Sequence, residues 1–220
     1  MFNSNGGMLT GSEIERQIKK GNILIDPFDP SCINPNSYNL KLHPQLKVYK
    51  RGSNRSDIVP TTRTFDLEKN AHILNKNDLI RECSYLESCQ LEPIDMLKDN
   101  ETIEFNIGEE GYVLQPGVLY IGRTVERTFT DKFIPMINGR SSGGRLGISI
   151  HICAGFGDIG FDGTWTLEIT AVEPVIIYPN VEIAQVCFFN PCGKTNKLYR
   201  GRYFGQEDAT ASRFYKAKEY

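Results

Sequence analysis

The chain has 220 residues, which is long enough for one sizeable hydrophobic core, and all-β domains of this length commonly remain undivided. Its formal net charge is only −2, so no global field draws it to nucleic acid or to an anionic membrane. No apolar run approaches the ~18 residues of a membrane span, and the first residues lack the pattern of a secretory signal. We expect one soluble domain in the cytoplasm, or in the host cytoplasm if the source is viral.

The first residues predict a flexible extension followed by a helix. Residues 1–7 are polar and rich in glycine, whereas Met8 resembles a second start before ordered sequence. Ser12 and Glu15 fit a capping box, and Gly21 can end the helix at its C-terminus. This pattern is typical of a short amphipathic helix of roughly two turns.

The middle of the chain predicts strands. Apolar and polar residues alternate in 38–42, 46–48 and 112–114, and similar short runs separated by Gly, Pro, Asn and Asp recur to about residue 190. Residues 77–100 are richer in Leu and charge and could hold a helix or an insertion. The prediction is a mainly β sandwich or barrel with a few short helices, extending over residues 8–193.

Residues 194–220 form a tail of a different character. It is rich in Lys, Arg, Tyr, Gly and Gln and has few side chains to bury. Two interpretations stay open at this point: a solvated, disordered tail, or a lid that becomes ordered over a polyanionic ligand.

The densest polar chemistry lies in residues 139–168. Arg140, Ser141 and Ser142 follow Gly139 and offer a guanidinium, two hydroxyls and accessible backbone N–H groups, which suit the oxygens of a phosphate chain. This segment is neither a Walker loop nor a Gly-x-Gly-x-x-Gly fingerprint, and taken alone it could be a turn. The residues that follow it favour a site.

Two carboxylates and a second arginine support that interpretation. Glu168 lies within an apolar strand pattern on the same face as Thr166, where a carboxylate is costly unless it is paired or functional. Its alternative is an outward position on an edge strand. Asp158 lies among glycines, where simple turn formation is the alternative. Because Arg145 lies in the same block, we expect an anion-binding and proton-transfer site.

Histidine and zinc chemistry are not indicated. His151 is a candidate base by residue type, but the isoleucines around it favour a structural histidine on a packed strand. A zinc-dependent deaminase needs a His-x-Glu motif and a Pro-Cys-x-x-Cys pair, and Pro191-Cys192 is not followed by the second cysteine. The six cysteines include no Cys-x-x-Cys pair, which favours reduced thiols over a disulfide framework.

Several ordered motifs resemble the deoxycytidine triphosphate (dCTP) deaminase family, which belongs with the trimeric dUTPases in one superfamily. The resemblance runs from about Met8 to Arg213. Its most specific parts are Asn-Pro-Asn-Ser-Tyr-Asn-Leu at 34–40, Leu-Gln-Pro-Gly at 114–117 with Gly-Arg-Thr at 122–124, Gly-Arg-Ser-Ser-x-x-Arg-Leu-Gly at 139–147, the run at 154–168, and the basic tail. The resemblance implies a homotrimer of distorted β-barrel, jelly-roll-like subunits with active sites at the subunit interfaces.

The resemblance also implies roles for single residues. Glu168 matches the catalytic glutamate, and Ser141, Arg145 and the backbone carbonyl of Ala154 match the groups that position the attacking water. The implied substrate-binding residues are Arg140, Ser142, Asp158, Phe161, Arg202, Tyr203 and Gln206. Mg²⁺ is expected to be held by the triphosphate, with no protein metal ligands and no zinc.

The expected reaction is the hydrolytic deamination of dCTP to dUTP and ammonia. One carboxyl group that accepts and returns protons can serve every step of it, which suits Glu168. A bifunctional enzyme that continues to dUMP and pyrophosphate is the alternative, because Asp158 and Phe161 also resemble the dUTPase motif. A non-catalytic nucleotide-binding regulator is a third hypothesis, and the resemblance suggests dTTP as an inhibitor.

The chain departs from the family pattern at a few positions. Asn39 lies where many relatives carry aspartate, which removes a carboxylate near the expected phosphate region and weakens the dUTPase alternative. Cys153 replaces a common threonine, and Arg202 replaces a common lysine. Gly143 and Gly144 make the loop that carries Ser141 unusually flexible.

Overall fold

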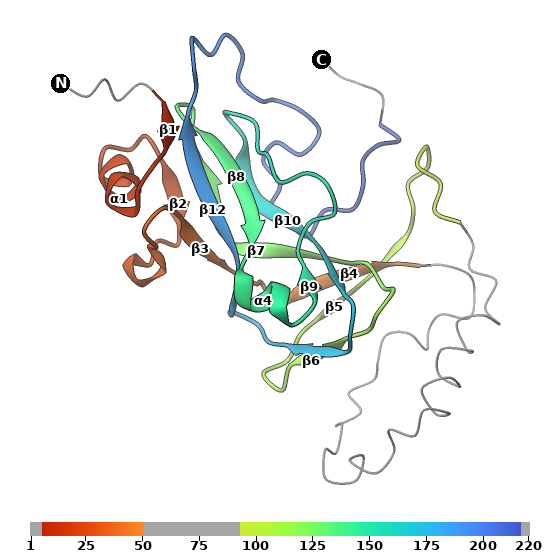
Figure 1. Cartoon of the computed structure of the whole chain (residues 1–220). Coiled ribbons are helices and arrows are strands. Elements are labelled where there is room, and N and C mark those ends of the chain that lie inside the picture. The colour runs from red at the N-terminus through yellow and green to blue at the C-terminus, as the bar shows by residue number, and fades with distance from the viewer. Residues whose placement is uncertain (1–5, 51–92, 217–220) are drawn as a thin grey trace.

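The computed structural model describes residues 6–50 and 93–216, which form two antiparallel sheets and one small two-stranded sheet (Figure 1). The helical elements are α1 (Gly11–Lys19), the 3₁₀ helix η1 (Pro30–Cys32) and α4 (Ser141–Arg145). The strands are β1 (Gly7–Met8), β2 (Leu24–Asp26), β3 (Tyr38–Lys41), β4 (Gln45–Tyr49), β5 (Thr102–Asn106), β6 (Tyr112–Leu114), β7 (Tyr120–Phe129), β8 (Ile134–Gly139), β9 (Ile148–Ser149), β10 (Asp162–Ala171), β11 (Val175–Ile177) and β12 (Glu182–Asn190).

The two main sheets each have a long strand to which several others pair. In the four-stranded sheet β12 pairs with β8, β3 and β1. In the six-stranded sheet the order is β5-β4-β7-β10-β9, and β2 also pairs with β7. Strands β6 and β11 form the two-stranded sheet. This arrangement confirms the predicted mainly β fold with few helices.

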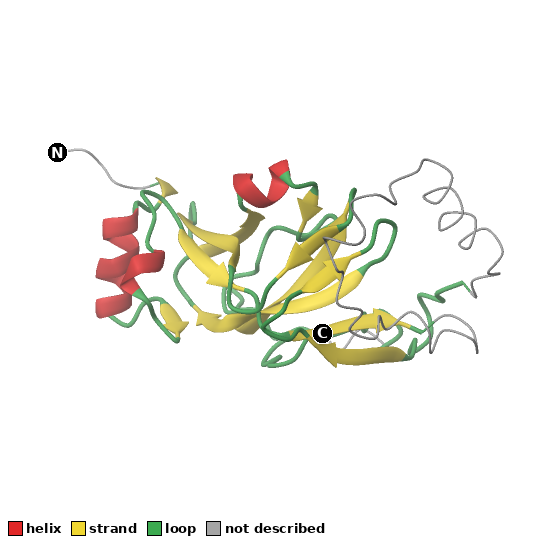
Figure 2. Cartoon of the chain, turned by 90° about the horizontal axis from the view of Figure 1, so that it is seen from below, coloured by secondary structure: helices red, strands yellow, loops and turns green. Residues whose placement is uncertain are grey.

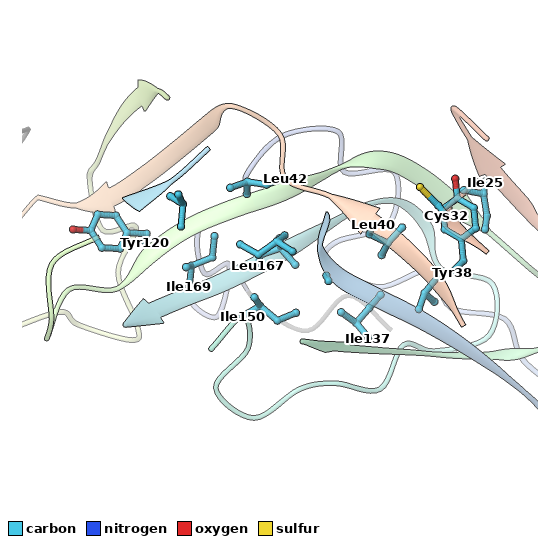
Figure 3. Packing of buried hydrophobic residues seen from close by; sticks show 14 of the residues in the cluster. Ile25, Cys32, Tyr38, Leu40, Leu42, Tyr120, Ile137, Ile150, Leu167 and Ile169 are labelled. Carbon is cyan, nitrogen blue, oxygen red and sulfur yellow. The ribbon is translucent and has the colours of Figure 1, made fainter. Parts of the chain in front are cut away.

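The hydrophobic core lies between the two main sheets (Figure 3). Along β10, Leu167, Ile169 and Ala171 are buried, whereas the residues between them are partly exposed, as the period of two in a strand requires. Side chains from the four-stranded sheet meet them from the other side: Tyr38, Leu40, Ile137, Ala184, Val186 and Phe188. Glu168 and Thr166 therefore lie on the outer face of β10, as the alternation predicts.

A buried carboxylate connects the two sheets. Glu126 of β7 is only 1% exposed, and its Oε2 accepts a 2.9 Å hydrogen bond from the backbone N–H of Lys41 in β3. Burial raises the pKa of this carboxyl above its ordinary value. The bond supplies a partner to an otherwise buried polar group at the point where the edge of β3 meets β7.

Helix α1 begins earlier than the capping box predicts. Thr10 precedes the helix, Ser12 lies inside it, and Glu15 forms an ion pair with Lys19, so the predicted capping box is wrong. The early start is possible because Gly11 lacks a Cβ, which would overlap the carbonyl oxygen of Asn34. Gly21 follows the helix with a φ of +73°, which confirms its predicted role at the C-terminus.

Some of the remaining sequence predictions agree with the structure, and others fall on residues that it does not describe. The strand patterns at 38–42, 46–48 and 112–114 correspond to β3, β4 and β6. Gly7, which was predicted to belong to the flexible extension, lies in β1 and pairs with Asn190 of β12. Residues 93–100, at the end of the predicted helix or insertion, contain a turn. The predictions for residues 1–5, 51–92 and 217–220 lie outside the described residues. No helix among those described has the length and apolar character needed to cross a membrane.

Substituting Leu167→Ala tests the packing of β10. Leu167 is fully buried, so we expect a loss of about 2–5 kcal/mol in the free energy of unfolding, measured by guanidinium denaturation. Leu97→Ala is the matched control, because Leu97 is 70% exposed and its truncation should change stability by less than about 0.5 kcal/mol. Equal losses in the two variants would contradict this description of the core.

Candidate active site

The Arg-Ser-Ser segment lies where β8 ends and the short helix α4 begins, at a distance from α1 (Figure 2). Ser141, Ser142 and Arg145 have exposed side chains. A Cβ at Gly143 or at Gly144 would meet no atom within 4 Å, so packing does not explain the two glycines. In the described part of the chain the Arg145 side chain has no hydrogen-bond or ion-pair partner. The loop thus presents hydroxyls, backbone N–H groups and one unpaired cation to solvent.

An open, partly polar pocket of about 460 Å³ adjoins this segment. Arg140 and Ser141 line one part of it, and Ser149, His151 and Gln185 line others. Arg140 is half-buried: its Nη1 lies 2.6 Å from a carboxylate oxygen of Glu182 and donates to the Glu182 carbonyl oxygen at 3.0 Å. The pocket therefore combines an oriented guanidinium with hydroxyl groups, which suits an anionic ligand.

Glu168 is partly exposed in the middle of β10, and the backbone of the loop after β9 holds its carboxylate. Its Oε2 accepts a 2.8 Å hydrogen bond from the backbone N–H of Ile152, and its own N–H donates to the carbonyl oxygen of Ile150. The side chain of Glu168 thus takes the place of a backbone acceptor just beyond the end of β9. The carboxylate has a fixed position and keeps a second oxygen for a ligand.

The loop after β9 departs from the predicted packed strand. Strand β9 ends at Ser149, and Ile152 is 64% exposed, so the prediction that His151 lies on a packed strand is wrong. The chain leaves the sheet because Ile152 bonds to a side chain instead of a neighbouring strand. His151 Nε2 lies 3.4 Å from Asn138 Oδ1, while its buried Nδ1 has no partner among the described residues. Ala154 and Asp158 are exposed on the same loop.

Phe161 packs in an aromatic group beyond this loop. Its ring centroid lies 4.5 Å from that of Trp165 and 6.0 Å from that of Tyr199. Gly157 makes this packing possible, because a Cβ there would overlap the Trp165 ring. Phe161 is only 8% exposed, so its position is fixed by the tail residue Tyr199 as well as by β10.

The tail is docked along β10 (Figure 1). The backbone N–H of Tyr199 donates to the carbonyl oxygen of Ile159 at 2.8 Å. Gln206 is buried, and its Nε2 donates to the Thr164 carbonyl oxygen at 2.8 Å and to Thr166 Oγ1 at 3.2 Å. From Tyr199 to Arg213 the structure thus shows the tail packed against the β domain. The amide N–H groups of Gln206 are used in docking, whereas Arg202 and Tyr203 remain half-exposed.

A second anchor of the tail could not be found from the sequence. Gln45 Oε1 accepts both from the backbone N–H of Ala209, at 3.0 Å, and from Arg123 Nε, at 3.2 Å. Ala209 is fully buried. Gln45 and Ala209 are separated by more than 160 residues in the chain, and a single glutamine in a strand pattern gives no signal of such a contact.

One chain brings some of the predicted site residues together and keeps others apart. Arg140 and Ser141 share the pocket, and the tail lies near Asp158 and Phe161 through Tyr199. Within the described residues, however, Glu168 makes no hydrogen bond or ion pair with Ser141 or Arg145. Within a single chain, Ser141 and Arg145 therefore make no polar interaction with Glu168, the expected proton carrier.

The model of the dCTP deaminase-like family matches residues 8–190. The chain belongs to the dCTP deaminase-like family. The matched range includes α4, β10 and the loop between them, so the family assignment covers the proposed site except for the tail.

Relatives with high sequence identity match over most of the chain. A protein named "dCTP deaminase, dUMP-forming" from Hathewaya histolytica is 43% identical over 196 residues, which cover 89% of this chain and 90% of that protein. Proteins with the same name from Clostridium beijerinckii and Leptospira biflexa are 41% and 37% identical over 209 residues, with 95% of this chain and 97% of each relative covered. These names specify dUMP as the product. The prediction of an enzyme that stops at dUTP is therefore wrong.

A solved structure shows the same fold. The crystal structure of 2′-deoxycytidine 5′-triphosphate deaminase from Agrobacterium tumefaciens matches with a TM-score of 0.52 and 20% identity. The match covers 85% of this chain but only 49% of that one. At this identity the likeness supports the dUTPase-like β fold and carries no information about individual site residues.

Substituting Gln206→Ala tests the docking of the tail. The change leaves the buried carbonyl oxygen of Thr164 without its donor, so we expect the tail to open more often. Trypsin cleavage after Arg200 and Arg202 should become about fivefold faster or more, followed by mass spectrometry. Glu207→Ala is the control, because Glu207 is exposed. Identical cleavage rates in the two variants would mean that Gln206 does not hold the tail.

Proposed function

We propose that the protein is a bifunctional dCTP deaminase that converts dCTP and two waters into dUMP, pyrophosphate and ammonia. The proposal is supported by relatives of 37–43% identity that share the name "dCTP deaminase, dUMP-forming" and match almost the whole chain. Within the structure it rests on one observation: the Glu168 carboxylate is held by the Ile152 N–H with one oxygen left for a ligand.

The first step is the deamination of the cytosine ring. Water attacks C4 while Glu168 accepts one of its protons and delivers it to N3 of the ring. The second water proton leaves with the amino group as ammonia when the C4–N bond breaks, so the uracil ring keeps its N3–H. Ser141, the carbonyl oxygen of Ala154 and Arg145 orient the water for attack.

The second step is hydrolysis at the α-phosphorus. Asp158 orients and deprotonates a second water, which forms a bond to the α-phosphorus while the bond to the bridging oxygen breaks and pyrophosphate leaves. Asp158 is exposed, and Phe161 lies three residues further along the chain, where its fixed ring can pack on the deoxyribose. Arg140, Ser142, Arg202, Tyr203 and Gln206 are the proposed contacts or supports of the phosphates.

The proposed site is completed by a second copy of the chain. Ser141 and Arg145 make no hydrogen bond or ion pair with Glu168 within the described residues. The proposal therefore takes the homotrimer that the family resemblance implies, with Glu168 of one subunit facing Ser141 and Arg145 of its neighbour. Large apolar side chains support an interface in this region, since Leu146, Ile152, Phe156 and Val172 are each 59–77% exposed.

Magnesium enters the proposal with the substrate. Among the described residues no three His, Cys, Asp or Glu side chains form a cluster that could bind a metal ion. A triphosphate provides oxygen ligands of the kind that Mg²⁺ prefers, and a bound ion would reduce the negative charge that builds up on the leaving pyrophosphate. Arg140 and Ser142 then contact the nucleotide oxygens that the ion leaves free.

Two substitutions separate the proposed steps. Glu168→Gln keeps an acceptor for the Ile152 N–H but cannot carry a proton, so we expect deamination of dCTP to slow by about 10²–10⁴-fold. Asp158→Asn should leave deamination active and change the product from dUMP to dUTP. Ion-exchange chromatography of the products over time measures both.

Three results would contradict this assignment. A Glu168→Gln protein with near wild-type deamination would remove the proposed proton carrier. Pyrophosphate release that persists in Asp158→Asn would exclude the proposed second step. Binding of dCTP by the wild-type protein without turnover, with Mg²⁺ supplied, would instead favour a nucleotide-binding regulator.

Mixed oligomers test whether the site spans two subunits. Glu168→Gln and Ser141→Ala proteins should each be nearly inactive alone. When they are co-expressed, about one quarter of the sites in a head-to-tail trimer combine Glu168 from one subunit with Ser141 from its neighbour. We expect about a quarter of wild-type activity in the mixture. No recovery in purified mixed trimers would show that the residues act within one chain.

A further inference from the structure

The Asn-Pro-Asn-Ser-Tyr-Asn motif at 34–39 has no role in the proposed chemistry, yet its side chains lead to Arg140. Asn34 Nδ2 donates to Asn39 Oδ1 at 2.6 Å and to Ser37 Oγ at 3.2 Å. Asn39 is 4% exposed and Ser37 is 2% exposed, so this part of the motif is buried. Its polar atoms are directed toward the neighbouring strand β12.

Two side chains of β12 receive these bonds. Asn39 Nδ2 donates to Glu182 Oε2 at 2.8 Å, and Ser37 Oγ donates to Gln185 Oε1 at 2.9 Å. The register explains the arrangement, because Gln185 pairs with Asn39, and an irregularity between Glu182 and Ala184 sets Glu182 apart from the regular ladder.

The same two side chains continue to the loop that carries the site. Gln185 Nε2 donates to the carbonyl oxygen of Gly139 at 3.0 Å, at the end of β8. Glu182 Oε2 lies 2.6 Å from Arg140 Nη1. Each half of the network thus begins at the 34–39 motif, passes through β12 and ends on Gly139 or Arg140.

We propose that Glu182 is a positioning residue for Arg140, which it directs toward the phosphates of the nucleotide, and that Asn39 holds Glu182 in place. The inference rests on the proposed function. Arg140 donates only Nη1 to Glu182, so its other N–H groups remain available to the pocket. A free arginine loses the motion of a long side chain when it binds phosphate, whereas an arginine that is already held does not.

An amide at position 39 fits this role better than a carboxylate. Asn39 uses its oxygen to accept from Asn34 and its nitrogen to donate to Glu182. An aspartate has no N–H to donate, and it would place a second negative charge beside Glu182. Asn39 therefore leaves Glu182 as the one carboxylate that contacts Arg140 in the described part of the chain.

Removing Glu182 has two opposing effects on KM for dCTP, one through charge and one through the mobility of Arg140. Removing Glu182 increases the net positive charge near Arg140, which favours a triphosphate, but it also frees the guanidinium. The two side chains are 31% and 32% exposed, so water screens the charge effect and the loss of order dominates. We expect Glu182→Ala to raise KM for dCTP about fivefold, with kcat changed less than about twofold.

A double-mutant cycle in the full-length protein tests whether Glu182 acts through Arg140. KM and kcat for dCTP are measured for wild type, Glu182→Ala, Arg140→Ala and the double variant. If Glu182 acts through Arg140, the double variant has the same KM as Arg140→Ala alone. Glu173→Ala is the control for the loss of one negative charge, because Glu173 is exposed on the loop after β10.

Each outcome decides the inference. KM effects that multiply in the double variant, a KM for Glu182→Ala equal to that of the control, or a fall in kcat at constant KM would overturn it. If Glu182→Ala does not fold, Glu182→Met removes both the charge and the oxygen acceptors at nearly constant volume and should raise KM in the same direction. A wild-type protein that does not turn over dCTP would refute the proposed function instead, before any variant is compared.

Discussion

The structure depends on the antiparallel pairing of β10 with β7, because this one strand has to serve the core and the site at the same time. Its inward face buries Leu167 and Ile169, whose positions are fixed by the close packing of the core. Its outward face carries Glu168 and Thr166, which bind the Ile152 N–H and the docked tail. The positions of the carboxylate, the loop and the tail thus follow from the position of a strand that the core makes rigid.

The sequence predicts most of this fold because the relevant signals are local. Alternation along 166–171 separates the buried face from the outer one, and Gly21 marks a helix end by its backbone freedom alone. The failures have local causes too. The capping box at Ser12 was displaced by tertiary contacts of Gly11, and the strand around His151 ends early because a side chain replaces its neighbouring strand.

The candidate site could be predicted in its residue types but not in its assembly. Arg140, Ser141, Asp158 and Glu168 stand out because polar chemistry is concentrated in one stretch of the chain. Contacts between distant segments leave no such signal, and the link from Asn39 through Glu182 to Arg140 joins β3, β12 and the residue between β8 and α4. The sequence pattern also could not identify the product, because Asp158 is expected both in enzymes that stop at dUTP and in enzymes that continue to dUMP.

The central claim is that a single site carries dCTP through both reactions. The most direct test is to incubate the protein with dCTP labelled in the ring, Mg²⁺ and an excess of unlabelled dUTP, and to follow the label by chromatography. If one site holds the intermediate, we expect the label in dUMP from the first turnovers, with little label in dUTP. Label that accumulates in the dUTP pool would show that the intermediate is released, and would contradict the account.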